Sequence, residues 1–248
     1  TYYDAMNPQD LATKIQANTK LVWLEAPGSV SMEFPDLIQL IRICKTHSVI
    51  TALDNTWGAG LAFNAFDLTP EQGELGVDLT IHALTKYPSG GGDVLMGSVI
   101  TRDAALHMKL KLTHMRMGFG VGANDVEAVL RGLPSLALRY RAHDETTRTL
   151  AQWCQTRCEF VQVLHPALPD SPGHEHWREV CQGGPGHAAG LLSVIFQAHY
   201  SQSQIDAFCD ALKLFKIGYS WGGPMSLVMP YNMASSRTRS TAHMQQGR

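Results

Sequence analysis

The sequence predicts an α/β fold with a mostly parallel sheet flanked by helices, and three observations support that class. Short apolar runs alternate with stretches in which apolar residues recur at helical spacing. The apolar runs are nearly continuous, as expected for strands covered on both faces. The chain has 248 residues and 44% hydrophobic residues, enough for one large domain with a substantial core and part of a second.

The first half of the chain carries the strand and helix pattern most clearly. Residues 19–27 form an apolar run that Pro27 and Gly28 close, which indicates a buried strand. Residues 34–47 show an apolar stripe at helical spacing. Three further strands and one helix are then expected, at residues 48–57, 76–84, 93–101 and 102 to about 117.

A glycine-rich break at residues 118–125 precedes a long helical region. We expect Asn124 to cap that helix with Glu127 as its capping-box partner, and Pro134 to kink or divide it. Two more strands and a helix are expected at residues 159–166, 189–197 and 203–215. The predicted organisation is a large domain, a linking helix region and part of a smaller α+β domain, at residues 1–123, 124–155 and 156–248.

Composition narrows the functional class. The net charge of −2 and the pI of about 6.6 give no sign of a nucleic-acid or anionic membrane partner. No apolar stretch approaches the roughly 20 residues of a spanning helix. The chain begins with Thr, without a signal region, so we expect an internal piece of a longer protein. An odd number of scattered cysteines favours reduced thiols in the cytoplasm: Cys44, Cys154, Cys158, Cys181 and Cys209.

Two ionisable residues follow neighbouring apolar runs. Asp54 closes one expected strand and Lys86 follows the next. If those strands lie side by side, both side chains face the crevice beyond their carboxyl ends, where α/β sheets bind ligands. A lysine amine and a carboxylate there suggest pyridoxal phosphate, with the lysine as Schiff base and the carboxylate on the pyridine nitrogen. On spacing alone, a turn aspartate and a surface lysine remain an open alternative.

Six segments, in order, resemble the pyridoxal-phosphate enzymes of cysteine and methionine metabolism. They are LEAPGSVSMEF, LDNTWGAGLAF, TKYPSGGGDVLMGSVI, RGLPSLALRYRAH, HPALPDSPGHEHW and FKIGYSWGG, at residues 24–34, 53–63, 85–100, 131–143, 165–177 and 215–223. The resemblance covers nearly the whole chain. It implies the fold-type I pyridoxal-phosphate transferase architecture, with pyridoxal 5′-phosphate as cofactor.

The resemblance also implies roles for individual residues. The lysine of the family's T-K-Y block falls on Lys86, the implied Schiff-base and catalytic residue. The aspartate of D-N-T-W falls on Asp54, the implied partner of the ring nitrogen. The threonine that precedes the lysine in the T-K-Y block falls on Thr85, an implied phosphate ligand. The implied substrate-binding residues are Ser220 and Trp221, with Tyr219 as a weaker candidate beside them. No metal is expected.

Two positions favour the β-eliminating branch of that family. The chain has Ser29 where γ-acting relatives usually carry Asn, and Trp57 where they carry Phe or Tyr. This implies a carbon–sulfur β-lyase of methionine biosynthesis that cleaves cystathionine or related S-linked amino acids to a thiol, pyruvate and ammonia. It also implies a cytoplasmic homotetramer, a dimer of dimers. Two alternatives stay open. The protein could be a cystathionine γ-lyase or methionine γ-lyase, or the chain could be a catalytically incomplete fragment that serves as an interaction module.

The chain departs from the family pattern at the glycine turn after Lys86, at Pro88, at Pro134-Ser135 and in the stretches that would flank it. A G-H-x-D turn usually follows T-K-Y, but Gly90, Gly91 and Gly92 precede Asp93 here. The family's ring-stacking tyrosine belongs to a stretch before Thr1, and its carboxylate-binding arginine to a block after Arg248, so the resemblance implies a fragment that holds part of the site.

Overall fold

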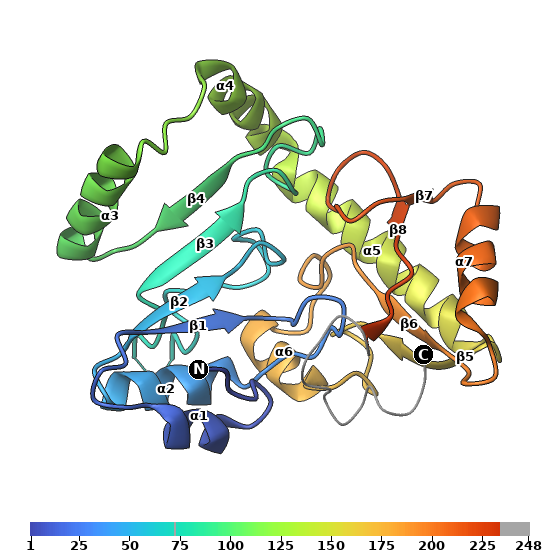
Figure 1. Ribbon diagram of the computed structural model, residues 1–248, viewed down its shortest axis with the longest axis horizontal. Coiled ribbons are helices and arrows are strands. Elements are labelled where there is room, and N and C mark those ends of the chain that lie inside the picture. Colours follow the sequence, from blue (N-terminus) through green and yellow to red (C-terminus); the bar gives the residue numbers. More distant parts are fainter. Residues whose placement is uncertain (72, 234–248) are drawn as a thin grey trace.

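The computed structural model describes residues 1–71 and 73–233 and is built around a four-stranded sheet in the order β1–β2–β3–β4 (Figure 1). The pairs β1–β2 and β2–β3 are parallel, and β3–β4 is antiparallel. The strands are β1 Leu21–Glu25, β2 Ile50–Asp54, β3 Leu79–Ala83 and β4 Gly97–Ile100. The mostly parallel sheet confirms the predicted fold class. The sequence pattern did not indicate that β4 runs antiparallel to β3.

Helix α2 (Leu37–Thr46) covers the sheet at the β1 and β2 end (Figure 1). Its Asp36 cap accepts a hydrogen bond from the Gln39 backbone N–H at 2.9 Å. The predicted apolar stripe is the buried face: Leu37, Ile38, Leu40, Ile41 and Cys44. Two helices that the pattern did not indicate are α1 (Pro8–Lys14) and α6 (His174–Cys181). Among the described residues, no helix has both the length and the hydropathy needed to cross a membrane.

The long helical region is divided as predicted at its proline. Helix α3 (Ala104–Met117) is followed by α4 (Ala123–Gly132), a 3-10 turn at Leu133–Ser135 and α5 (Leu136–Gln155). Pro134 lies in that 3-10 turn, where its missing N–H does not interrupt a continuous helix. The expected Asn124 cap was wrong: α4 already begins at Ala123, its N-cap is Gly122, and no side chain caps it.

The last third of the chain contains two small sheets. Antiparallel β5 (Phe160–Leu164) and β6 (Ser193–Phe196) form one, and parallel β7 (Lys216–Ile217) and β8 (Leu227–Val228) form the other, with α7 (Gln202–Ala211) between them in sequence. The division at residue 156 stays a proposal, and residues 234–248 lie outside the described residues. Trp177 of α6 shares one hydrophobic cluster with Leu40 of α2, so α6 packs on the core of the first sheet.

Helix α5 reaches from that core to the small sheets (Figure 1). Its Tyr140 is 1% exposed and donates a hydrogen bond from its hydroxyl to the Trp57 carbonyl at 3.1 Å. The Tyr140 ring also meets Tyr87 edge to face, with 4.9 Å between ring centroids. Tyr87, the residue after Lys86, therefore anchors the Lys86 segment to α5, the longest helix described.

A buried histidine makes stability depend on pH. His165 is fully buried, and its Nδ1 accepts a hydrogen bond from the Ala167 N–H at 3.2 Å. Burial, and then the charge of Arg148, lower the pKa of His165 from 6.5 to about 3. Because the folded state resists protonation, the unfolded state binds more protons below pH 6.5, and the folded state loses stability as pH falls.

We expect the free energy of unfolding to fall by about 2 kcal/mol more in the wild type than in His165→Asn between pH 7 and about pH 5. The asparagine oxygen can accept the Ala167 N–H without titrating. Urea unfolding at both pH values measures the difference, and His107→Gln, at an exposed site on α3, is the matched control. Equal pH dependence in the wild type and His165→Asn would show that the buried His165 is not the source of the stability loss at low pH.

Candidate active site

The two predicted ionisable residues lie at the same end of neighbouring strands. Asp54 is the last residue of β2, and Lys86 follows β3, which ends at Ala83. The parallel pairing of β2 with β3, with Asp54 opposite Ile81, confirms the expectation that these strands lie side by side. The Lys86 N–H donates to the Ala83 carbonyl at 3.1 Å, so the chain turns immediately and keeps Lys86 near the sheet edge.

Lys86 meets the distant segment that the sequence also singled out. Its Nζ donates a hydrogen bond to Ser220 Oγ at 3.0 Å and lies 5.1 Å from the ring centroid of Trp221. Burial lowers the pKa of the Lys86 amine. Burial therefore raises the neutral fraction of this amine above that of an exposed lysine, and the neutral form is the one that acts as nucleophile or base. A hydroxyl and an aromatic face lie against it.

Tyr87 holds the two segments together. Its ring lies 5.6 Å from that of Trp221, and its hydroxyl accepts a hydrogen bond from the Gly190 N–H at 2.6 Å. Gly222 has φ +72°, and a Cβ there would lie 3.0 Å from the Tyr87 backbone nitrogen. A glycine is required at that position because the turn after Trp221 lies directly on the backbone beside Lys86.

Asp54 is held by the turn that follows it. Its Oδ1 accepts a hydrogen bond from the Thr56 N–H at 3.0 Å, and the residue is half-buried. Its charge acts on His82 of β3, whose pKa burial lowers despite the opposing pull of the Asp54 carboxylate. His82 Nε2 lies 3.2 Å from Thr80 Oγ1. His82 is a neighbour of Asp54 that sequence reasoning missed, although its place four residues before Lys86 was a signal.

The other two predicted residues are placed differently. The Thr85 hydroxyl accepts a hydrogen bond from the Met96 N–H at 3.2 Å, so its phosphate role remains a prediction. Tyr219 is 71% exposed, and its described ring contact is with Tyr231 at 6.1 Å rather than with the lysine. The structure thus brings Lys86, Ser220 and Trp221 into contact and leaves Tyr219 outside that group.

The glycine run beyond Lys86 has a local explanation. Gly90 has φ +67°, and a Cβ there would lie 2.4 Å from Arg139 Nη1. That arginine donates to the Tyr87 carbonyl at 2.7 Å and to the Gly132 carbonyl at 2.9 Å. A Cβ at Gly91 would lie 2.4 Å from Asp93 Oδ1, so a histidine in place of Gly91 would require Asp93 to move.

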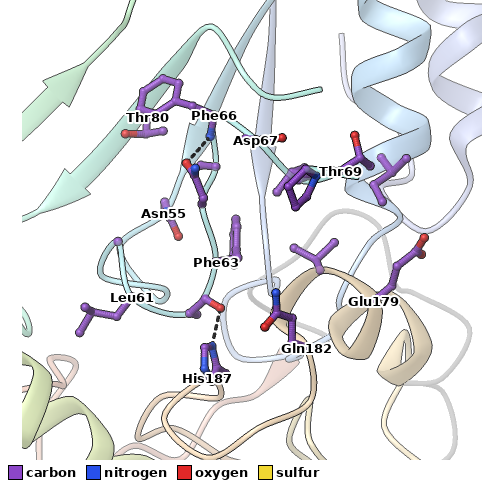
Figure 2. Close-up of a pocket in the computed structure, with 18 of the residues that line it drawn as sticks. Asn55, Leu61, Phe63, Phe66, Asp67, Thr69, Thr80, Glu179, Gln182 and His187 are labelled. Carbon is purple, nitrogen blue, oxygen red and sulfur yellow. Dashed lines mark hydrogen bonds between the residues drawn. The ribbon is translucent and has the colours of Figure 1, made fainter. Parts of the chain in front are cut away.

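A cavity of about 790 Å³ has Thr80 and His82 of β3 in its wall (Figure 2). Its walls come mainly from the loop at residues 60–71, from β3 and from α6. None of the six predicted site residues is among its described lining residues, and neither is any lysine. Covalent attachment of an aldehyde needs an amine, and the described lining of this cavity offers no lysine, so Lys86 stays the predicted attachment residue.

The chemistry of three predicted residues fits pyridoxal phosphate. An amine with a lowered pKa, a carboxylate on the next strand end and a threonine hydroxyl come from one edge of the sheet. Among the described residues, no group of three or more His, Cys, Asp or Glu side chains could hold a metal ion.

Sequence comparison identifies proteins that resemble this chain over most of its length. Residues 1–247 match the model of a protein family described as "Cys/Met metabolism PLP-dependent enzyme". The chain is 37% identical over 228 residues to a cystathionine beta-lyase of Bordetella avium, covering 92% of this chain and 54% of that protein. It is 33% identical over 235 residues to an L-alanine/L-glutamate racemase of Wolbachia pipientis wMel, covering 95% of this chain and 55% of that protein.

Solved structures show the same fold. The chain matches metB from Corynebacterium glutamicum with a TM-score of 0.81 and 27% identity, over 92% of this chain and 56% of that one. It matches a cystathionine gamma synthase from Xanthomonas oryzae pv. oryzae in complex with cystathionine with a TM-score of 0.79 and 29% identity. That match covers 98% of this chain and 59% of the other. The chain thus spans about half the length of the curated relatives it matches, which are covered to 54% and 55%.

Proposed function

Because the chain belongs to the Cys/Met metabolism PLP-dependent enzyme family, we propose that it is the catalytic part of a carbon–sulfur β-lyase. The proposed substrate is cystathionine or a related S-linked amino acid, and the products are homocysteine or another thiol, pyruvate and ammonia. The observation that carries the proposal is the contact of Lys86 Nζ with Ser220 Oγ and with the face of Trp221.

The cofactor of this family is pyridoxal 5′-phosphate, which supplies an electron sink for the negative charge that develops at the substrate Cα. Lys86 would hold the cofactor covalently through Nζ. Asp54 would lie against its ring nitrogen and keep that nitrogen protonated, and the Thr85 hydroxyl would contribute to its phosphate site. The Thr56 N–H fixes the orientation of the Asp54 carboxylate for that role.

Lys86 would also move the proton. Burial lowers the pKa of the free amine and so raises its neutral fraction above that of an exposed lysine, and the neutral amine would remove the Cα proton. Once Nζ carries that proton, the Ser220 oxygen accepts a hydrogen bond from the ammonium and the Trp221 ring attracts its charge. The electron pair of the Cα–H bond forms the Cα–Cβ double bond, and the sulfur leaves with the electrons of the C–S bond. Water then hydrolyses the enamine that remains to pyruvate and ammonia.

The β-specific assignment is supported by two residues and by named relatives. Ser29 lies beyond the end of β1 and donates from Oγ to Glu25 Oε1 at 2.6 Å, and Glu25 is the register partner of Asp54. Trp57 is 5% exposed and meets the Phe34 ring at 6.2 Å. Cystathionine beta-lyases are among the relatives at 33% to 37% identity. The similarity to cystathionine gamma synthases makes a γ-acting enzyme the second candidate.

The products decide between these candidates. We expect the chain, loaded with pyridoxal phosphate and given cystathionine, to release pyruvate and homocysteine, measured by chromatography of derivatised keto acids and thiols. Protein that has been stripped of cofactor is the control. Release of 2-oxobutyrate would instead assign the γ branch. Covalently bound cofactor with neither keto acid would mean that the chain is an incomplete fragment or an interaction module.

We further propose that the protein works in the cytoplasm, in methionine biosynthesis, as a dimer of dimers. The support for an oligomer is helix α3, which has no buried residue in the described chain. Several large apolar side chains on and after it are more than half exposed: Met108, Met115, Met117 and Phe119.

A further inference from the structure

The cavity beside β3 contains two buried oxygens with no hydrogen-bond partner among the described residues. They are Asn55 Oδ1 and Asp67 Oδ1. Asn55 is 2% exposed and Asp67 is half-buried, and both side chains line the cavity (Figure 2). Because a buried acceptor without a donor costs roughly 1–3 kcal/mol, two in one cavity indicate that a donor-bearing group completes it.

The charges around the cavity specify the sign of that group. The lining includes the carboxylates of Asp67, Glu71 and Glu179 and the imidazoles of His82 and His187, and its described residues include no lysine or arginine. Burial lowers the pKa of His82, which disfavours the charged form of that imidazole. The described lining therefore offers three carboxylates and the unpaired Asn55 oxygen, with no lysine or arginine opposite them.

The apolar walls specify the body that carries the charge. Phe63 is 7% exposed and lines the cavity together with Leu61 and Phe66 (Figure 2). The Phe66 ring already attracts one guanidinium, since Arg102 Cζ lies 5.2 Å from its centroid. A volume of about 790 Å³ accommodates a ring-sized molecule with room for water.

We propose that this cavity is a second ligand site, separate from Lys86, for a small organic cation: an ammonium or amidinium group on an aromatic or aliphatic body. The cationic N–H groups would donate to Asp67 and Asn55 in the depth of the cavity. The exposed carboxylate of Glu179 would contribute at its rim, and Phe63 would cover the apolar body. The site goes beyond the lyase proposal and does not depend on it.

The test compares three probes that share one ring and differ in charge: benzamidine, benzamide and benzoate. We expect benzamidine to bind saturably in a calorimetric titration, and benzamide and benzoate to bind at least about tenfold more weakly. Equal binding of benzamidine and benzamide would show that charge is not recognised and would overturn the proposal, as would absence of benzamidine binding at millimolar concentration.

Variants locate the binding. Asp67→Asn should weaken benzamidine about tenfold, and the exposed Glu179→Gln about threefold. Both should fold, because each removes a charge and keeps the side-chain volume. Asp210→Asn on α7 removes one exposed carboxylate elsewhere, and it and Lys86→Ala should leave the affinity unchanged. Unchanged binding in Asp67→Asn, or loss in Asp210→Asn or in Lys86→Ala, would place the probe outside this cavity and refute the assignment.

Discussion

Replacing Lys86 with alanine should abolish lyase turnover, with a loss of about 10³-fold or more in the rate of pyruvate release. The reason is that one amine is assigned two tasks, covalent attachment of the cofactor and removal of the Cα proton. Its contacts with Ser220 and Trp221 have no substitute from another amine within the described site. Pyruvate release from cystathionine measures the effect.

A second measurement separates attachment from turnover. Borohydride reduction of the cofactor-loaded wild type, followed by peptide mass spectrometry, should place the cofactor on Lys86, and Lys86→Ala should retain none. The matched control is Lys109→Ala, an exposed lysine of α3, which should behave as the wild type. Pyruvate release at the wild-type rate by Lys86→Ala would remove Lys86 from the mechanism.

Replacing Asp144 with alanine should destabilise the fold by about 3–5 kcal/mol. Asp144 lies in α5 and is fully buried. Its Oδ1 accepts from Arg148 Nε at 2.9 Å, and its Oδ2 accepts from the Gly186 N–H at 2.6 Å. The substitution leaves a partly buried guanidinium and a backbone donor without their carboxylate. Urea unfolding monitored by tryptophan fluorescence measures the loss.

The neighbouring residue supplies the control. Glu145 also forms an ion pair along α5, with Arg141 Nε at 2.8 Å, but both side chains are more than half exposed. Glu145→Ala should therefore leave the urea midpoint close to that of the wild type, because solvent screens an exposed ion pair. Similar losses in the two variants would show that burial does not set the strength of the Asp144 contact.

The Asp144 contact matters for the site because it holds α5 against the segment after α6. Arg148 donates to the Gly184 carbonyl at 2.9 Å and lies 5.3 Å from the ring centroid of Trp177. Gly190, a few residues further along that segment, donates to the Tyr87 hydroxyl. Loss of the buried carboxylate should therefore loosen the segment that supports the residue after Lys86.

Several features could be predicted from the sequence because they depend on local chemistry. The apolar runs identified the four strands of the main sheet, and the stripe at residues 34–47 identified the buried face of α2. The proline rule divided the long helical region at Pro134. The placement of Asp54 and Lys86 at one edge followed from a general property of parallel strands, whose carboxyl ends meet at the same side of the sheet.

Other features could not be predicted because no local pattern encodes them. The direction of β4 depends on how the chain returns from the turn after Lys86, and a run of apolar residues reads the same in either direction. Helix α6 begins after Gly173 in a segment of mixed polarity, and its buried Trp177 has meaning only against the core of another part of the chain.

The sequence by itself thus determined which side chains stand at the ends of the strands, since periodicity and turn residues act over a few neighbours. The tertiary structure decided what those side chains meet. Ser220 lies 134 residues from Lys86 in sequence, and their hydrogen bond exists because Tyr87, Gly222 and α5 pack the two segments together. Such contacts depend on the shape and burial of the whole fold, and these determine both the pKa of the lysine and the unpaired oxygens of the cavity.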